Sequence, residues 1–219
     1  MGIEGIAPKV LEVMSLIDKF SAQLDREGFF PASGHLLIAV SGGVDSMVLW
    51  DLCARLGYSI EILHVNFQLR GQESEDDEHF VQQMGIAYGC KVWSKRFDTI
   101  AYAKSHRVSV QVAARDLRYE WFREVRQTCI NSLPAGAPQP VILTAHHADD
   151  NLETMMMNFF RGTGIAGLRG ILPRQHYLIR PLLPYRKEEL LSYATQQKLK
   201  WREDSSNAKE DYTRNYFRH

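Results

Sequence analysis

Two consecutive glycines stand between an apolar run and a helical pattern, where a loop could bind an anion. Residues 41–46 read Ser-Gly-Gly-Val-Asp-Ser. Glycines permit backbone conformations closed to other residues, so successive N–H groups can turn toward one anion, and the following helix adds its positive end. Ser41 and Ser46 offer hydroxyl groups, and Asp45 would suit a divalent cation that accompanies a phosphate. The segment lacks the Walker lysine and the third glycine of the dinucleotide fingerprint, and a tight turn with a Ser/Asp cap would also explain it.

A second constellation places ionisable side chains at helical spacing. His146, Asp150 and Glu153 follow one another at i, i+4 and i+7, which predicts one helical face. Such carboxylates could hold a metal, bind an ammonium group, or hold a lysine cation and then accept its proton. A capping Asp149 with a solvated acidic first turn is the structural alternative. We do not expect zinc at His146 and His147, because no third nitrogen or sulfur ligand lies nearby.

Basic residues form two further candidate features. Arg115 and Arg118 lie one turn apart on a long helical pattern, and Arg115 could stabilise phosphate charge in a bidentate manner. Pairing with Asp116 or Glu120 at the surface is the alternative, and it would contribute little. From residue 161 onward, twelve Lys/Arg face six Asp/Glu, a net charge of +6. This last quarter could contact phosphates of a nucleic acid, or simply carry solvated charge.

The elements that must position these residues alternate between strand and helix. Short apolar runs predict buried strands, and helical spacing follows each of them. We therefore expect an α/β fold, a Rossmann-like and mainly parallel sheet with helices on both faces and the site at the carboxyl ends of the strands. Residues 133–140, rich in proline, are a loop and the best linker candidate. The predicted strands are 35–40, 60–65, 91–97 and 141–144, and the predicted helices are 45–56, 73 to about 87, 109–130 and 145–160.

Composition excludes several classes of protein. The chain has 219 residues, 45% hydrophobic and 24% charged, which is typical of a folded domain rather than a disordered one. Lys+Arg 26 and Asp+Glu 26 balance, so a uniformly basic nucleic-acid coat is excluded. No apolar run approaches the ~20 residues that span a bilayer, so we expect no membrane association. Cys53, Cys90 and Cys129 are widely spaced and form no C-x-x-C pair, which argues against a disulfide framework or a structural zinc site and favours the reducing cytoplasm.

The motifs resemble a known group of enzymes. Residues 41–46 resemble the pyrophosphate loop of the N-type ATP pyrophosphatases (the PP-loop superfamily), which adenylate a substrate and release pyrophosphate. One block of this kind is weak evidence, but several further blocks occur in the order found in the tRNA(Ile)-lysidine synthetase family. These blocks are 64–70, 114–119, 144–154, 161–164 with 167–168, 180–183, and 203–207 with 214–215.

The resemblance implies an adenine nucleotide alpha-hydrolase-like fold and a ligase that forms a carbon–nitrogen bond. ATP would adenylate C2 of the wobble cytidine in an isoleucine tRNA with a CAU anticodon, and free L-lysine would displace AMP to give lysidine. Mg²⁺ would accompany the ATP, with Asp45 as its candidate ligand. The resemblance assigns ATP binding to Ser41, Gly42, Gly43, Val44, Asp45, Ser46 and His64, catalysis to Asp45, Arg115, Asp150 and Glu153, and substrate binding to Asp150, Glu153, Arg161 and Arg214.

The chain departs from the family at Phe67-Gln68, where many members carry His-Gly, so no histidine role transfers to that position. We expect an N-terminal helical lead-in at 1–32 and a catalytic domain at 33–219. Members continue into further helices and usually C-terminal tRNA-binding domains, so we expect an N-terminal fragment of a longer enzyme; a homodimer is left open. The alternatives are a tRNA 2-thiolation enzyme, another adenylating synthetase of the superfamily such as an amidotransferase type, and a nucleotide-binding regulator without catalysis.

Overall fold

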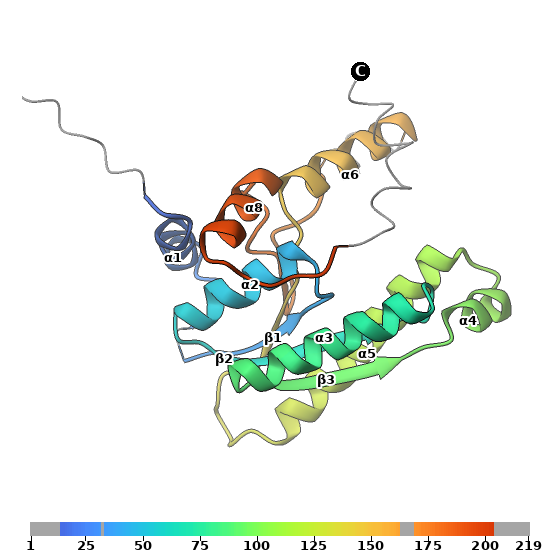
Figure 1. Ribbon diagram of the computed structural model, residues 1–219, viewed down its shortest axis with the longest axis horizontal. Coiled ribbons are helices and arrows are strands. Elements are labelled where there is room, and N and C mark those ends of the chain that lie inside the picture. Colours follow the sequence, from blue (N-terminus) through green and yellow to red (C-terminus); the bar gives the residue numbers. More distant parts are fainter. Residues whose placement is uncertain (1–13, 32, 163–168, 204–219) are drawn as a thin grey trace, which may run out of the picture.

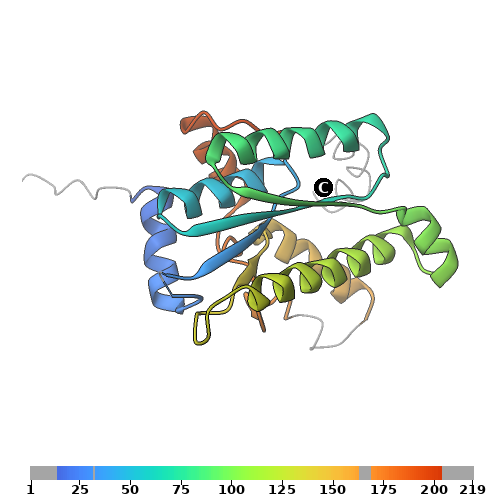
Figure 2. The same ribbon diagram turned by 90° about the horizontal axis from the view of Figure 1, so that it is seen from below.

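The computed structural model describes residues 14–31, 33–162 and 169–203. One six-stranded sheet forms its centre, in the order β3-β2-β1-β4-β6-β5 (Figures 1 and 2). β1 pairs in parallel with β2 and β4, and only β5 runs antiparallel, against β6. The expected fold class is therefore confirmed. The strands are β1 His35–Ala39, β2 Ser59–Asn66, β3 Lys91–Arg96, β4 Val141–Leu143, β5 Arg174–Gln175 and β6 Leu178–Ile179.

Helices cover both faces of this sheet and divide the core in two, as Figure 2 shows. On one face, α1, α2, α3 and α8 pack on Leu36 and Ile38 of β1; on the other, α5 packs on Leu37 through Trp121 and Phe122. Successive β1 side chains thus point to opposite buried faces, which explains the continuous apolar run. The helices are α1 Leu16–Glu27, α2 Val44–Arg55, α3 Gln72–Tyr88, α4 Thr99–His106, α5 Val110–Asn131, α6 Ala148–Phe160 and α8 Lys187–Gln196.

The structure bears on two expected boundaries, the loop at 133–140 and the N-terminal lead-in. The loop predicted at 133–140 contains no helix or strand, but it joins α5 to β4 of the same sheet and so separates no domains. Helix α1 lies within the predicted lead-in, and its Phe20 and Leu24 belong to the main core. The domain limits at 1–32 and 33–219 stay predictions. Every helix in the described ranges is too short or too polar to cross a membrane.

Candidate active site

The loop after β1 combines a glycine at positive φ with an open helix end. Gly42 has φ +99°, and a Cβ there would lie 3.4 Å from the Phe80 ring, so this position requires glycine. Gly43 has an ordinary φ of −72° and is the N-cap of α2, with no side-chain cap. Its N–H donates to Ser41 Oγ (3.2 Å), and its carbonyl accepts from Ser46 Oγ (2.8 Å). The loop is thus held by its own serines, and the first turn of α2 remains open toward an anion.

A cavity of about 310 Å³ opens beside this loop. β1 lies between β2 and β4, so the loops after β1 and β4 leave in different directions and create a crevice at the carboxyl ends of the strands. One part of the lining is polar and includes Asp45, Thr144 and Asp150. The other part is apolar, with Leu63 and Val65 among its residues. The crevice could therefore bind a molecule with an anionic end and a flat apolar end.

Asp45 has a partner that the sequence analysis missed. Lys187, the first residue of α8, directs its Nζ to both carboxylate oxygens of Asp45, at 2.7 and 2.6 Å. The Nε2 atom of His147 lies 3.8 Å from the same carboxylate. Lys187 stands 142 residues away in sequence, so no local spacing could reveal the pair. Asp45 is therefore an anchored, partly buried carboxylate rather than a free one.

A second cavity, of about 410 Å³, adjoins the first and contains both predicted carboxylates. Asp150 and Glu153 line it, and Asp150 and His146 line the first cavity as well. His146 precedes α6, so its predicted place on the helix is wrong, although its side chain still lies beside that of Asp150. The two cavities thus share one wall.

The residue that caps α6 is not Asp149. Asp150 Oδ2 accepts the backbone N–H of His147 at 2.9 Å and forms the capping box. Asp149 instead accepts the backbone N–H of Lys187 at 2.8 Å and ties α6 to α8. The alternative in which Asp149 caps the helix is therefore wrong. Asp150 holds the helix start with one oxygen and lines both cavities.

Two arginines of α5 face these cavities. Arg118 lines the first and Arg115 the second, and within the described chain the contacts of both are with aromatic rings rather than with Asp116 or Glu120. The Arg118 guanidinium lies 5.1 Å from the Phe67 ring centroid, and burial lowers its pKa. Arg115 is exposed, whereas Arg118 is a desolvated cation that pairs with no carboxylate among the described residues, and such a cation suits an anionic ligand. The sequence alone assigns a role to Arg115 but none to Arg118.

His146 stays neutral in this environment. Its pKa is lowered to about 4, mainly by burial; Asp150 opposes this shift, and the nearby arginines Arg180, Arg118 and Arg115 add to it. Its Nδ1 lies 2.9 Å from the Thr144 hydroxyl. A neutral imidazole at the shared wall can accept or donate a hydrogen bond without adding charge.

The remaining predicted residues lie elsewhere. His64 is buried beneath the loop, where its Nδ1 meets the Val40 carbonyl at 2.8 Å, and it is not among the residues that line either cavity. Arg161 is the exposed C-cap residue of α6, at the opposite end of that helix from Asp150. Arg214 lies outside the described residues. His64 thus supports the strand end, and its assignment to ATP stays a prediction.

A strap from late in the chain holds the glycine loop. The backbone N–H of Arg202 donates to the Gly42 carbonyl at 2.9 Å. Its guanidinium Nε donates to Asp77 Oδ1 at 2.9 Å, and Asp77 also accepts from Arg70 at 2.7 Å. The acidic first turn of α3 complements the helix dipole, and Asp77 in addition anchors this strap.

Comparison with known proteins identifies the family. The model of the PP-loop domain matches residues 14–219. The chain belongs to the PP-loop family. The tRNA(Ile)-lysidine synthase of Bacteroides thetaiotaomicron is 43% identical to this PP-loop chain, over 89% of the chain and 44% of the relative. That of Chlorobaculum tepidum is 38% identical, over 91% and 59%. The chain thus spans about half the length of the curated relatives it matches.

Solved structures support the fold of this PP-loop chain. The U34-tRNA thiolase NcsA from Methanococcus maripaludis, with its [4Fe-4S] cluster, aligns with a TM-score of 0.62 at 19% identity, over 85% of this chain and 64% of that one. NMN synthetase from Francisella tularensis aligns with a TM-score of 0.54 at 13% identity, over 84% and 71%. At such identities the likeness concerns the fold alone.

Proposed function

We propose that this chain carries the catalytic site of a tRNA(Ile)-lysidine synthetase. The observation that carries the proposal is the pair of adjoining cavities with a shared wall, one beside the glycine loop and the other containing two carboxylates. A ligase of this type must bring a nucleotide and an amine together at one atom. The names and identities of the relatives support the same activity.

The first cavity would hold ATP. The open N-terminus of α2 faces the phosphates, the apolar part beside Leu63 and Val65 receives the base, and Arg118 compensates phosphate charge. The C2 oxygen of the wobble cytidine attacks the α-phosphorus, and pyrophosphate leaves. The cytidine must leave its stack to reach this crevice.

The second cavity would hold free L-lysine. Asp150 and Glu153 provide two carboxylates for its ammonium groups, and Arg180, which also lines the cavity, suits its carboxylate. The lysine ε-amine must lose a proton before it attacks C2 of the adenylated cytidine and AMP leaves. Asp150 lies at the shared wall and is placed to accept that proton.

Mg²⁺ would find its protein ligand at Asp45. A carboxylate that lines the phosphate end of the first cavity suits this hard cation, which is commonly held by one or two carboxylates and phosphate oxygens. The ammonium of Lys187 occupies both oxygens of Asp45 here, so the ion and Lys187 would compete for this carboxylate. When bound, Mg²⁺ would compensate the charge of the departing pyrophosphate.

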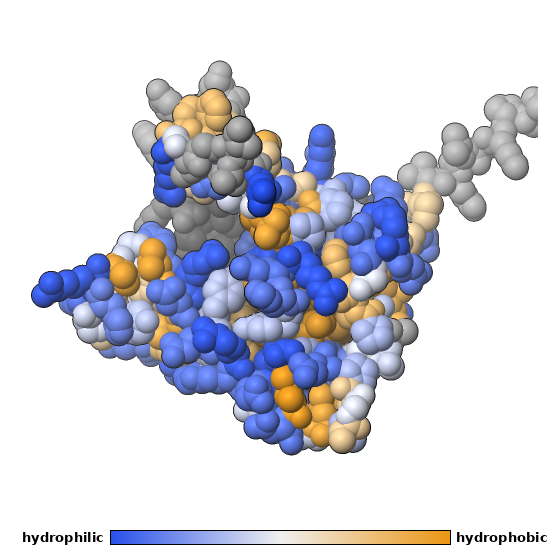
Figure 3. Space-filling view, turned by 180° about the vertical axis from the view of Figure 1, so that it is seen from behind, coloured by the Kyte–Doolittle hydropathy of each residue, from blue (hydrophilic) through white to orange (hydrophobic). Residues whose placement is uncertain are grey.

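The tRNA would approach across exposed cations of the last quarter of the chain. Hydrophilic residues predominate on the face shown in Figure 3, with apolar residues in small separate groups. Not all of the +6 charge is available, because Lys187 and Arg202 have acidic partners.

Removing one cation that pairs with a tRNA phosphate should reduce the salt slope of binding by about 0.7 to 0.9. Charge reversal at Arg169, Arg174 and Lys200, all exposed, should flatten that slope in filter binding, and an identical slope would refute the proposed tRNA surface.

A single-turnover assay tests the ligation itself. Pyrophosphate release from ATP is measured with a CAU-anticodon isoleucine tRNA. AMP release is compared with and without lysine, and lysine incorporation is followed when lysine is present. Glu153→Gln should retain pyrophosphate release and lose lysine transfer, whereas Glu120→Gln, on the exposed side of α5, should retain both. AMP release that does not depend on lysine would overturn the proposal. The alternative of a tRNA 2-thiolation enzyme is disfavoured already by the structure, because none of the chain's three cysteines lines either cavity.

A further inference from the structure

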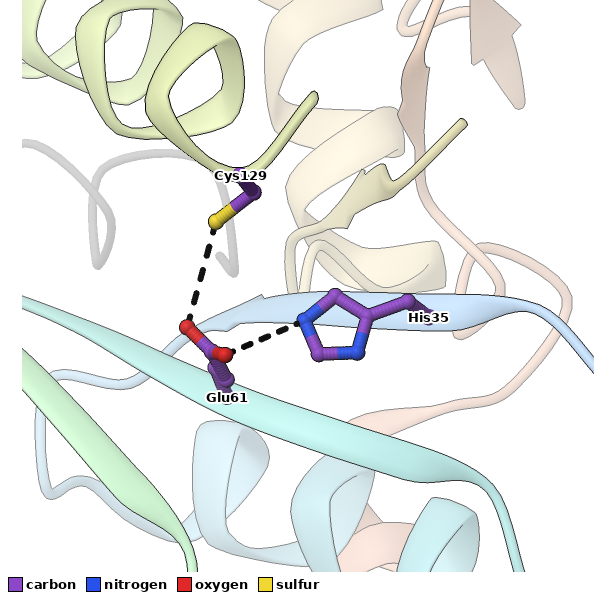
Figure 4. A group of neighbouring side chains, drawn as sticks. All are labelled: His35, Glu61 and Cys129. Atoms are coloured by element: carbon purple, nitrogen blue, oxygen red, sulfur yellow. Dashed lines mark hydrogen bonds and ion pairs between the residues drawn. The ribbon is translucent and has the colours of Figure 1, made fainter. Parts of the chain in front are cut away.

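Three potential metal ligands converge at the end of the sheet opposite the two cavities. His35 is the first residue of β1, Glu61 lies near the start of β2, and Cys129 lies near the end of α5. Figure 4 shows the imidazole and the thiol directed toward the same carboxylate. All three are partly buried. None of them belongs to the candidate active site.

The spacing of the three ligand atoms suits a small tetrahedral cation. His35 Nε2 lies 3.5 Å from Glu61 Oε1, and Cys129 Sγ lies 3.9 Å from Glu61 Oε2. The three ligand atoms lie within 4.8 Å of one another. Zinc bonds of about 2.0 to 2.3 Å separate tetrahedral ligands by roughly 3.3 to 3.8 Å. Small side-chain rotations would therefore bring the set into coordination.

The surrounding residues orient the ligands as in metal sites. Nδ1 of His35 lies 3.0 Å from the Ser59 hydroxyl, which leaves Nε2 directed to Glu61. The Trp93 indole N–H donates to Glu61 Oε2 and holds the carboxylate. Hydrogen bonds of this kind typically fix the tautomer and orientation of metal ligands. The three ligands come from three different elements, and Ser59 and Trp93 orient two of them, so the arrangement has the features of a metal site.

We propose that His35, Glu61 and Cys129 bind a divalent ion of the zinc class, with water as the fourth ligand. The ion would tie α5 to β1 and β2 at the end of the sheet remote from catalysis. One nearby charge opposes it: Lys91 Nζ lies 3.7 Å from Glu61 Oε2. This side chain is 57% exposed, so its ammonium can move into solvent when the ion binds.

The thiol must lose its proton for this site to fill. Burial raises the pKa of Cys129, the Glu61 carboxylate raises it further, and Lys91 opposes them. Metal binding should therefore release a proton and become stronger as pH rises, with His35 neutral in the bound state.

Cobalt(II) titration of the full chain tests the site, because a cobalt–thiolate bond gives a near-ultraviolet charge-transfer band and tetrahedral cobalt gives visible bands. We expect both bands in the parent, loss of the charge-transfer band in Cys129→Ser, and no loss in Cys90→Ser, a matched cysteine of similar burial. Zinc should displace the cobalt. Lys91→Gln should strengthen cobalt binding roughly fivefold by removing a nearby like charge.

Circular dichroism checks that each variant is folded. If Cys129→Ser fails to fold, His35→Gln provides the second test and should weaken cobalt binding at least tenfold. The proposal is overturned if the parent shows no thiolate band, or if the band survives Cys129→Ser and disappears in Cys90→Ser.

Discussion

The buried His146 should make folding stability depend on pH. Its pKa in the folded chain is about 4, against 6.5 for an ordinary histidine, mainly because of burial. As pH falls, the unfolded chain therefore binds a proton before the folded one does. This contribution to stability is complete above about pH 6.5 and is lost progressively toward pH 4. Linkage gives a loss of about 2 kcal/mol between pH 7 and pH 5, and about 3 kcal/mol below pH 4.

The substitution His146→Gln removes this titration and keeps a polar side chain at the wall between the cavities. Urea unfolding followed by circular dichroism at pH 7, 6 and 5 gives the free energy of unfolding for each protein. The parent should lose about 2 kcal/mol more than the variant over this range. Some dependence should remain in the variant, because burial lowers the pKa of His64 as well. His79→Gln, at an exposed histidine, should behave like the parent. Equal pH slopes for parent and His146→Gln would refute the reasoning.

Three further tests, two of them with a matched control substitution, concern the loop, a departure from the family and the Asp45 pair. Gly42→Ala should lower the free energy of unfolding by about 1 to 3 kcal/mol and weaken ATP binding in calorimetry, whereas Gly43→Ala, at φ −72°, should cost less than about 1 kcal/mol. Gln68 has φ +52°, so Gln68→Gly should stabilise by about 0.5 to 1 kcal/mol in urea unfolding, while Gln68→Ala gives no gain. Lys187→Met should strengthen Mg²⁺ binding measured by calorimetry, because Asp45 loses a competing ammonium; unchanged binding would place the ion elsewhere.

The central strands and the long helices could be predicted because their signals are local. The residues from Leu36 to Val40 are all apolar because β1 is buried on both faces. The two glycines that follow this run mark the loop. The helix expected over 109–130 becomes α5 over Val110–Asn131, with Ser109 as the cap. Periodicity and capping residues carry this information without any knowledge of tertiary packing.

The short elements had no such signal. β5 and β6 contain two residues each, and their pairing depends on β4 rather than on their own sequence. α4 follows β3 after two residues and begins at an Asp98 cap within a mixed, mostly exposed segment. α8 has an apolar face at Leu190 and Tyr193, but its ten residues lie in a basic quarter of the chain where charge is the stronger signal. Tertiary packing stabilises each of these elements.

The same distinction applies to the candidate site, and it explains why residues far apart in sequence matter to one loop. The glycines, Asp45, Asp150 and Glu153 belong to compact motifs that follow two neighbouring strands, so topology alone brings them together. Lys187 and Arg202 do not: one arrives with α8, and the other follows it and is anchored by Asp77 of α3. These two residues hold the loop from opposite ends: the Lys187 ammonium binds the Asp45 carboxylate, and the backbone N–H of Arg202 donates to the Gly42 carbonyl. Because α8 and α3 pack on the same face of the sheet as α2, any change in their packing moves the groups that hold the loop.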